Sequence, residues 1–112
     1  MTISMDLRRL EQQLRQFAAE RDWEQFHSPK NLSMALAVEA AELLEHFQWL
    51  TEAQSASLDS VERGKVAAEI ADIQIYLTII AHKLDIDIEA AVNAKLESNS
   101  VKYPAHNPTR QN

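Results

Sequence analysis

Apolar residues recur every three or four positions over most of this chain, and this spacing constrains the fold more than any other feature. In the segment 5–22, Leu7, Leu10, Leu14 and Phe17 share one helical face, while arginine and glutamate fill the other. One glycine and three prolines among 112 residues are too few turn formers for a sandwich or a barrel. The sequence therefore predicts an all-α fold.

Two of the predicted helices have clear start signals. Ser28 reads as an N-cap, and Pro29 after it suits the first helical position, so the second helix is expected to run from Pro29 to about Leu50. Asp59 followed three residues later by Glu62 predicts a capping box at the start of the third helix. The segment between these two helices reads as a polar connection.

The rest of the chain completes a single domain. The third helix is expected to continue to about Leu84, and a shorter fourth helix lies within residues 85–98. Residues 99–112 read as an ordered strap followed by a mobile end. We therefore assign residues 1–104 to one domain and residues 105–112 to a mobile C-terminal tail.

Composition excludes several classes of function. Cysteine is absent, which rules out disulfides and thiolate chemistry, and no long apolar run predicts a membrane span or a secretory leader. We therefore expect a cytoplasmic protein. The formal net charge of −6 makes duplex nucleic acid a poor partner. A small phosphate ligand stays compatible with this charge, because bound divalent cations reverse the local sign. A helical chain this short often buries its remaining apolar surface against a second copy.

Two acid pairs stand at matching places on the second and third helices. On a helical wheel Glu39 lies at the edge of the apolar stripe, with Glu42 about 60° further round and His46 on the same side. Glu69 and Asp72 repeat this arrangement on the third helix. If both stripes face one core, the two acid pairs face each other across a cleft.

Four carboxylates this close would repel one another unless some are protonated or a cation lies among them. An all-oxygen ligand set favours Mg²⁺ and argues against zinc. It also argues against a ferritin-like di-iron site, which needs Glu-x-x-His. The alternative is that the pairs are solvated surface charges. The chain would then be a helical dimerisation module. A third hypothesis is a regulator that binds nucleotide or a divalent cation without turnover.

The acid pairs and their flanks resemble a known family. "EAAE" at Glu39–Glu42 and "EIAD" at Glu69–Asp72 resemble the Glu-x-x-Glu … Glu-x-x-Asp motif of the all-α nucleoside triphosphate pyrophosphohydrolases, the MazG-like superfamily. The segments "FAAERDWEQFHSPKNLSMAL", "ELLEHFQWL", "EIADIQIYL" and "AKLESNSVKYP" are similar, in the same order, to the dCTP pyrophosphatase branch. The resemblance extends from about Leu14 to Pro104.

The resemblance implies a four-helix bundle that assembles as an intertwined dimer or a dimer of dimers. It implies hydrolysis of a nucleoside triphosphate to the monophosphate and pyrophosphate with Mg²⁺, or with Mn²⁺ in its place. The implied metal ligands are Glu39, Glu42, Glu69 and Asp72. We expect Glu42 to act as general base and count Glu69 with it as catalytic.

The resemblance also implies a nucleotide site, with dCTP or a modified pyrimidine deoxynucleotide as the expected substrate and house-cleaning as the role. The aromatic members are expected to stack on the base, and Lys95 to contact the phosphates. Leu14 stands where vertebrate dCTP enzymes have a histidine near the base, and the family pattern gives no role to His46. We assign His82 and His106 to the surface. The implied substrate contacts are Trp23, His27, Trp49, Tyr76, Lys95 and Asn99, with Lys30 and Lys102 as weaker candidates.

Overall fold

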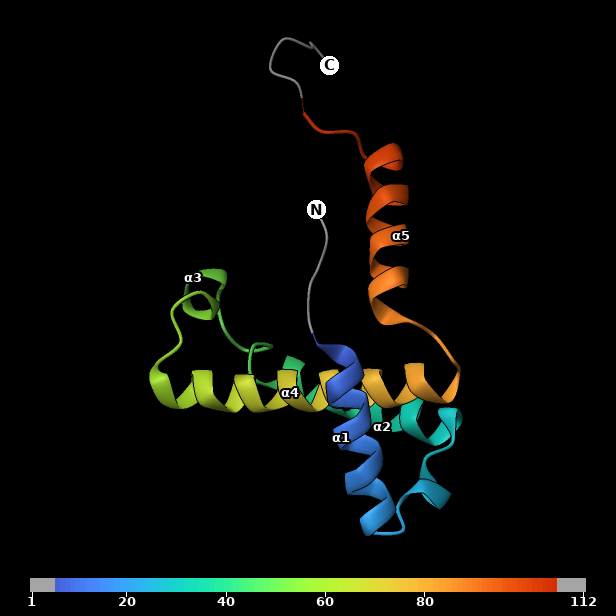
Figure 1. The fold of residues 1–112 in the computed structure, drawn as a ribbon. Coiled ribbons are helices and arrows are strands. Elements are labelled where there is room, and N and C mark those ends of the chain that lie inside the picture. The colour runs from blue at the N-terminus through green and yellow to red at the C-terminus, as the bar shows by residue number, and fades with distance from the viewer. Residues whose placement is uncertain (1–5, 107–112) are drawn as a thin grey trace.

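A computed structural model describes residues 6–106, and within them all regular secondary structure is helical. The all-α prediction is confirmed. No helix in this part of the chain combines the length and apolarity needed to cross a membrane. The elements are α1 (Leu7–Glu20), the 3₁₀ turn η1 (Glu24–Phe26), α2 (Pro29–Glu45), α3 (Glu52–Ser55), α4 (Ser60–Lys83) and α5 (Ile88–Lys102) (Figure 1).

The predicted start signals act as caps. The Oγ of Ser28 accepts a hydrogen bond of 3.1 Å from the Asn31 backbone N–H, with Pro29 at the first helical position of α2. At the start of α4, Asp59 Oδ1 accepts from the Glu62 backbone N–H at 2.8 Å. This is the Asp59 half of the expected capping box, whereas the Glu62 carboxylate accepts from Lys65 Nζ at 3.1 Å.

The end of α2 and the following connection differ from the sequence prediction. α2 stops at Glu45 instead of about Leu50, because the His46 and Phe47 N–H groups bond three residues back and tighten the last turn. The polar connection contains the short helix α3. Thr51 and Gln54 start α3 with a reciprocal capping box that the sequence reading missed.

The last helix is longer than expected. α5 continues to Lys102, through the first part of the segment that we expected to be a strap, and its C-cap is Tyr103, immediately before Pro104. Proline disfavours the helical conformation in the residue before it, which explains this boundary. Most of the predicted tail, residues 107–112, lies outside the described residues.

The core of one chain is the packing of α4 against α2 and α1. α2 and α4 run antiparallel side by side, and α1 crosses α4 (Figure 1). Leu32 on α2 is 2% exposed, and the small residues Ala18 on α1 and Thr78 and Ala81 on α4 are also buried. The Thr78 hydroxyl donates to the Gln74 carbonyl at 2.8 Å, which satisfies this buried group within its own helix.

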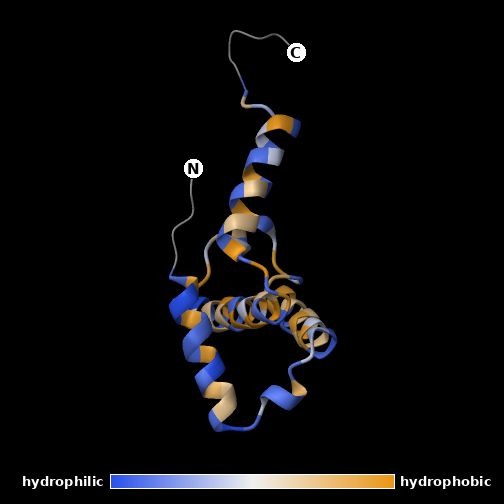
Figure 2. Cartoon of the chain, turned by 45° about the vertical axis from the view of Figure 1, so that its right-hand side comes forward, coloured by the Kyte–Doolittle hydropathy of each residue, from blue (hydrophilic) through white to orange (hydrophobic). Residues whose placement is uncertain are grey.

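α5 runs away from the other long helices (Figure 1). Apolar residues recur along it even though no other helix within residues 6–106 covers it (Figure 2). Val101 is 81% exposed, and Leu96 is exposed as well. The Cα radius of gyration is 17.9 Å, whereas a compact domain of about 100 residues has a value of about 13 Å. A single chain thus leaves much apolar surface uncovered.

Candidate metal centre

Three acids from two helices meet where α2 and α4 run side by side. Glu39 comes from α2, and Glu69 and Asp72 come from α4. One carboxylate oxygen of each lies within 4.8 Å of the others. The antiparallel pairing sets Glu39 opposite Glu69, and the three-residue spacing brings Asp72 to the same side. The structure therefore brings together three of the four predicted metal ligands.

Within this cluster Glu39 and Glu69 are half-buried, whereas Asp72 is exposed. The Oε2 atoms of Glu39 and Glu69 are shielded from solvent and have no hydrogen-bond partner. A buried acceptor without a partner is unfavourable, and a buried anion more so. Oxygen donors arranged in this way fit a hard divalent cation such as Mg²⁺. The residues present therefore suit the metal that the family resemblance implies.

Glu39 shows the electrostatic strain of the cluster. Its pKa is raised above the ordinary value, first because Glu69 is close enough to share a hydrogen bond with the protonated acid. Burial of the carboxyl and the negative charge of Asp72 raise it further. Two ionised carboxylates have no proton with which to form a hydrogen bond to each other, which agrees with the unpartnered Oε2 atoms of Glu39 and Glu69. Either a proton or a cation can relieve this repulsion.

Glu42 lies one turn beyond Glu39 on α2 and is half-buried. Its carboxyl is also within hydrogen-bond reach of Glu39, where it lowers the Glu39 pKa and partly opposes Glu69. Glu42 is outside the group whose oxygens lie within 4.8 Å of one another. Its assignment as metal ligand and general base stays a prediction.

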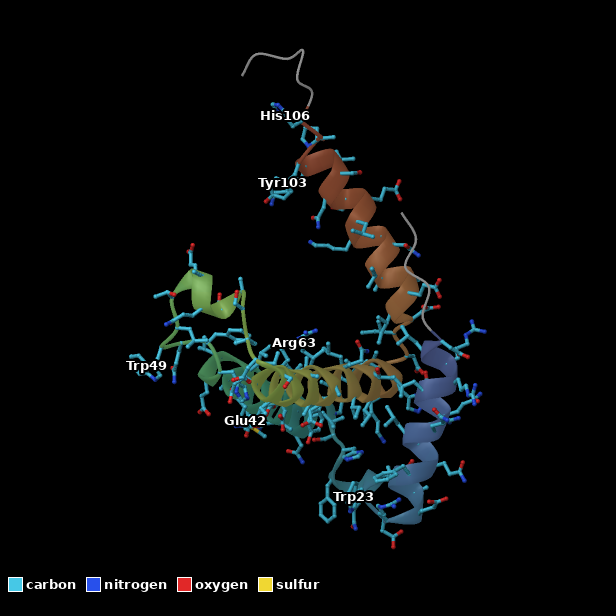
Figure 3. All side chains as sticks on the ribbon, turned by 90° about the vertical axis from the view of Figure 1, so that its left-hand side faces the viewer. Trp23, Glu42, Trp49, Arg63, Tyr103 and His106 are labelled. Carbon is cyan, nitrogen blue, oxygen red and sulfur yellow. The ribbon has the colours of Figure 1, made fainter. Side chains whose placement is uncertain are left out.

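The two tryptophans predicted to stack on a base lie apart in one chain. Trp49, in the turn after α2, is 87% exposed, whereas Trp23 lies beyond the end of α1 (Figure 3). The Trp23 ring already packs edge-to-face on Phe17, with centroids 5.5 Å apart, and the Arg21 guanidinium lies 3.5 Å from the Phe17 ring centre. A single chain therefore does not form the expected stacking box.

His27 and Tyr76 lie at different places on the α2–α4 body. His27 is half-buried and lines a small cavity between α1 and α4, beside Leu14. In the wall of this cavity, His82 Nδ1 lies 2.7 Å from Glu11 Oε1 and so ties α4 to α1. Tyr76 is half-buried on α4, one turn after Asp72.

The predicted phosphate contacts are not gathered around the acid cluster by one chain. Lys95 and Asn99 belong to α5, which runs away from the α2–α4 pair (Figure 1). Lys30 is exposed at the start of α2. Lys102 lies at the end of α5, with its Nζ 5.3 Å from the centre of the Tyr103 ring.

A model of the MazG-like family matches residues 34–110, which include all four predicted metal ligands. The chain belongs to the MazG-like family. Over 103 residues this MazG-like chain is 43% identical to dCTP pyrophosphatase 1 of Rattus norvegicus and 44% identical to that of Homo sapiens. These matches cover 90% of the chain but only 59% of each relative.

A solved structure supports the fold assignment. The crystal structure of a pyrophosphatase from Archaeoglobus fulgidus superposes with a TM-score of 0.75 at 35% sequence identity. The match covers 94% of this chain and 98% of the archaeal chain. The helical arrangement of the MazG-like chain is therefore that of a known pyrophosphatase structure.

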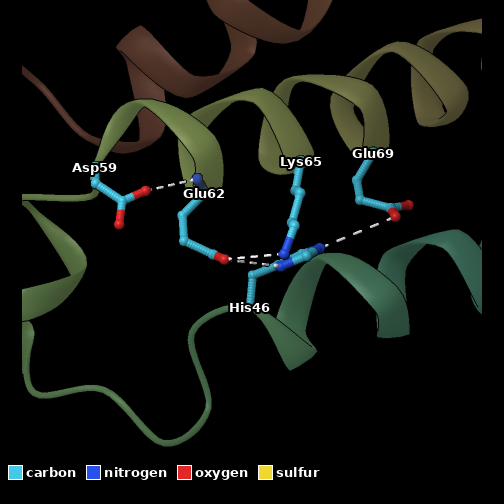
Figure 4. A network of polar contacts seen from close by, with 5 residues as sticks. All are labelled: His46, Asp59, Glu62, Lys65 and Glu69. Atoms are coloured by element: carbon cyan, nitrogen blue, oxygen red, sulfur yellow. Dashed lines mark hydrogen bonds and ion pairs between the residues drawn. The ribbon is translucent and has the colours of Figure 1, made fainter.

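Sequence reasoning missed one group beside the cluster of this MazG-like chain. The His46 ring lies between Glu62 and Glu69, with Nδ1 3.6 Å from Glu62 Oε2 and Nε2 4.0 Å from Glu69 Oε1 (Figure 4). The helical wheel placed His46 on the same side of the second helix as Glu42, and this position could have indicated that His46 lies beside the acids. Its partner Glu62 was read only as a helix cap.

Proposed function

We propose that this chain is a Mg²⁺-dependent pyrophosphohydrolase that converts a nucleoside triphosphate to the monophosphate and pyrophosphate. The observation that carries the proposal is the pair of shielded, unpartnered carboxylate oxygens of Glu39 and Glu69, which meet Asp72 from the next turn of α4. These residues would hold the metal, with Glu42 as a fourth ligand from the adjoining turn. Mn²⁺ would fit the same oxygen ligands.

The names of the relatives support a nucleotide substrate. Because the matched curated proteins are named dCTP pyrophosphatase 1, we propose dCTP or a modified pyrimidine deoxynucleotide as the substrate. Removal of such a nucleotide from the pool would be a house-cleaning reaction. The bound cation would neutralise phosphate charge, which otherwise repels a nucleophile.

Glu42 and Glu69 would have different roles in the reaction. Glu42 would take a proton from a water molecule that attacks the α-phosphorus. The bond from this phosphorus to the bridging oxygen breaks, and pyrophosphate leaves with that oxygen. Glu69, as ligand, keeps the acid cluster aligned with the attacked phosphorus. Glu42 is suited to proton transfer because it lies beside the group of three and not inside it.

A second copy of the chain would complete the nucleotide site, as a homodimer or a homotetramer. Lys95 and Asn99 on α5 cannot serve the acid cluster of their own chain while α5 points away from it (Figure 1). Val61 and Ile70 on α4 and Val101 on α5 expose apolar side chains that a single chain leaves uncovered. Packing α5 of one copy over α4 of another would bury these residues and bring Lys95 and Asn99 to a cluster.

The substrate contacts proposed within the assembly are aromatic and imidazole groups around the base. Trp23, His27, Trp49 and Tyr76 are distributed over three parts of one chain, so assembly would have to bring together those that contact one nucleotide. Base–aromatic stacking supplies affinity, and hydrogen bonds to the base edges supply selectivity.

The test is a panel of nucleoside triphosphates incubated with the purified protein and Mg²⁺, scored separately for pyrophosphate and orthophosphate. We expect pyrophosphate with a pyrimidine deoxynucleotide, loss of activity with EDTA, and recovery with Mn²⁺. Glu69→Gln should be inactive, whereas Glu45→Gln, an exposed glutamate at the end of α2, is the matched control and should remain active. Nucleotide binding without turnover in the native protein would favour the regulatory alternative.

A further inference from the structure

An imidazole lies between the acid cluster and the start of α4, and the family pattern gave it no role. The His46 side chain is 21% exposed and faces two carboxylates of α4. Its Nδ1 lies 3.6 Å from Glu62 Oε2, and its Nε2 lies 4.0 Å from Glu69 Oε1 (Figure 4). The ring therefore lies between a metal-ligand candidate and a carboxylate outside the cluster.

Glu62 is itself held in place from two sides. Its Oε1 accepts a hydrogen bond of 3.1 Å from Lys65 Nζ on the next turn. Its backbone N–H donates to Asp59 Oδ1 at 2.8 Å, which fixes the first turn of α4 (Figure 4). Because α2 ends at Glu45, His46 is the first residue beyond the helix, and its ring reaches across to both acids of α4.

Glu69 needs such a support. Its side chain has three rotatable bonds, and its Oε2 is shielded from solvent without a hydrogen-bond partner. Its Oε1 lies on the His46 side. In metal sites, a partner behind the ligand fixes the orientation of the ligand, and loss of that partner typically weakens metal binding by about 10- to 100-fold.

We propose that His46, braced by Glu62, is a positioning residue that holds the Glu69 carboxylate in the orientation needed to bind the metal. This inference rests on the proposed metal site. His46 acts through Glu69 and does not touch the substrate. When a cation draws the acids together, the His46 Nε2 to Glu69 Oε1 distance of 4.0 Å would shorten to that of a hydrogen bond.

The test measures Mn²⁺ binding to the full chain without nucleotide, by electron paramagnetic resonance of free Mn²⁺. We expect His46→Ala to raise the Kd for Mn²⁺ by about 10-fold or more, and His46→Gln, which keeps an amide donor, to restore part of the affinity. Glu62→Gln should weaken binding less than His46→Ala. The double variant should be no weaker than His46→Ala alone, because both changes remove one line of support.

Two controls separate the outcomes. Glu45→Gln, the exposed residue immediately before His46, should leave the Kd unchanged, and thermal unfolding reports whether each variant still folds. A folded His46→Ala protein with native Mn²⁺ affinity would overturn the inference. A loss as large as that in Glu69→Gln would make His46 a direct ligand and overturn it as well.

The same Mn²⁺ measurement distinguishes failure of the positioning role of His46 from failure of the proposed metal site. If Glu69→Gln weakens Mn²⁺ binding while His46→Ala does not, only the positioning role fails. If native Mn²⁺ affinity persists in Glu69→Gln, the acid cluster is not the metal site, and the proposed function fails with it. A lowered melting temperature of His46→Ala with unchanged Mn²⁺ affinity would mean a purely structural contact.

Discussion

Replacement of Trp49 by alanine distinguishes a ligand contact from a structural residue. The Trp49 side chain is 87% exposed, so it contributes little to the fold of one chain. A tryptophan presents roughly 150–250 Å² of surface, of which about an eighth is buried here. At about 25 cal/mol per Å² this corresponds to roughly 0.5–0.8 kcal/mol of unfolding free energy. The melting temperature of Trp49→Ala should therefore fall by only a few degrees.

The effect on the reaction should be much larger. Stacking on a base contributes about 1–3 kcal/mol, so its loss should raise KM by about 5- to 150-fold. The assay is steady-state release of pyrophosphate, with gel filtration of the variant in parallel. Trp49→Phe, which keeps an aromatic face, should recover most of the affinity. If the native protein elutes as an oligomer and Trp49→Ala elutes as a monomer with KM unchanged, the reasoning is refuted and Trp49 is an interface residue.

The other predictions concern charge and packing. Glu42→Gln should abolish pyrophosphate release while leaving the far-ultraviolet circular dichroism unchanged, and unfolding of this variant would make Glu42 structural. Because the Glu39 pKa is raised in the fold, the folded metal-free protein binds more protons than the unfolded chain just above the ordinary pKa of a glutamate. Its stability should fall as pH rises through that window, and Glu39→Gln should remove this part of the slope in urea titrations at successive pH values. Leu32→Ala, at the most buried leucine, should lower the unfolding free energy by about 2–5 kcal/mol in the same titrations.

Much of the fold could be predicted because its determinants are local. Apolar spacing identifies the helices, and the Ser28 and Asp59 side chains cap the helices that they were predicted to begin. The acid cluster followed from the same geometry. Glu69 and Asp72, three residues apart on one helix, share a face, and this face meets Glu39 on α2. The apolar stripe beside them is only partly covered, since Ile70 and Leu77 are exposed.

Features that depend on distant segments were not predictable in the same way. The early end of α2 depends on a turn that leads into the Thr51 cap, and the helical wheel extended the helix past it. The contact of His46 with Glu62 depends on that turn and on the register of α2 against α4. The pairing of His82 with Glu11 needs the crossing of α1 over α4, so we had assigned His82 to the surface.

The direction of α5 also could not be predicted from the sequence pattern. Its apolar positions show that α5 must pack on something, but periodicity carries no information on whether that surface belongs to the same chain. The exposed Val101 and Leu96 show that a single chain does not supply it. Trp23 and Trp49 also lie apart in one chain, so a single chain does not bring them to one substrate site (Figure 3).

The small number of buried apolar residues and the acid cluster both affect the stability of the α2–α4 pair. Among residues 6–106 the buried apolar residues are only Ala18, Leu32 and Ala81, so few fully buried apolar side chains offset the repulsion between the carboxylates. A bound cation removes the repulsion, and a second copy over α4 would supply the missing packing. Cation binding and the packing of a second copy both stabilise the α2–α4 pair, so each process should favour the other. Metal affinity and assembly of this chain should therefore be thermodynamically coupled, since whatever stabilises the α2–α4 pair stabilises both.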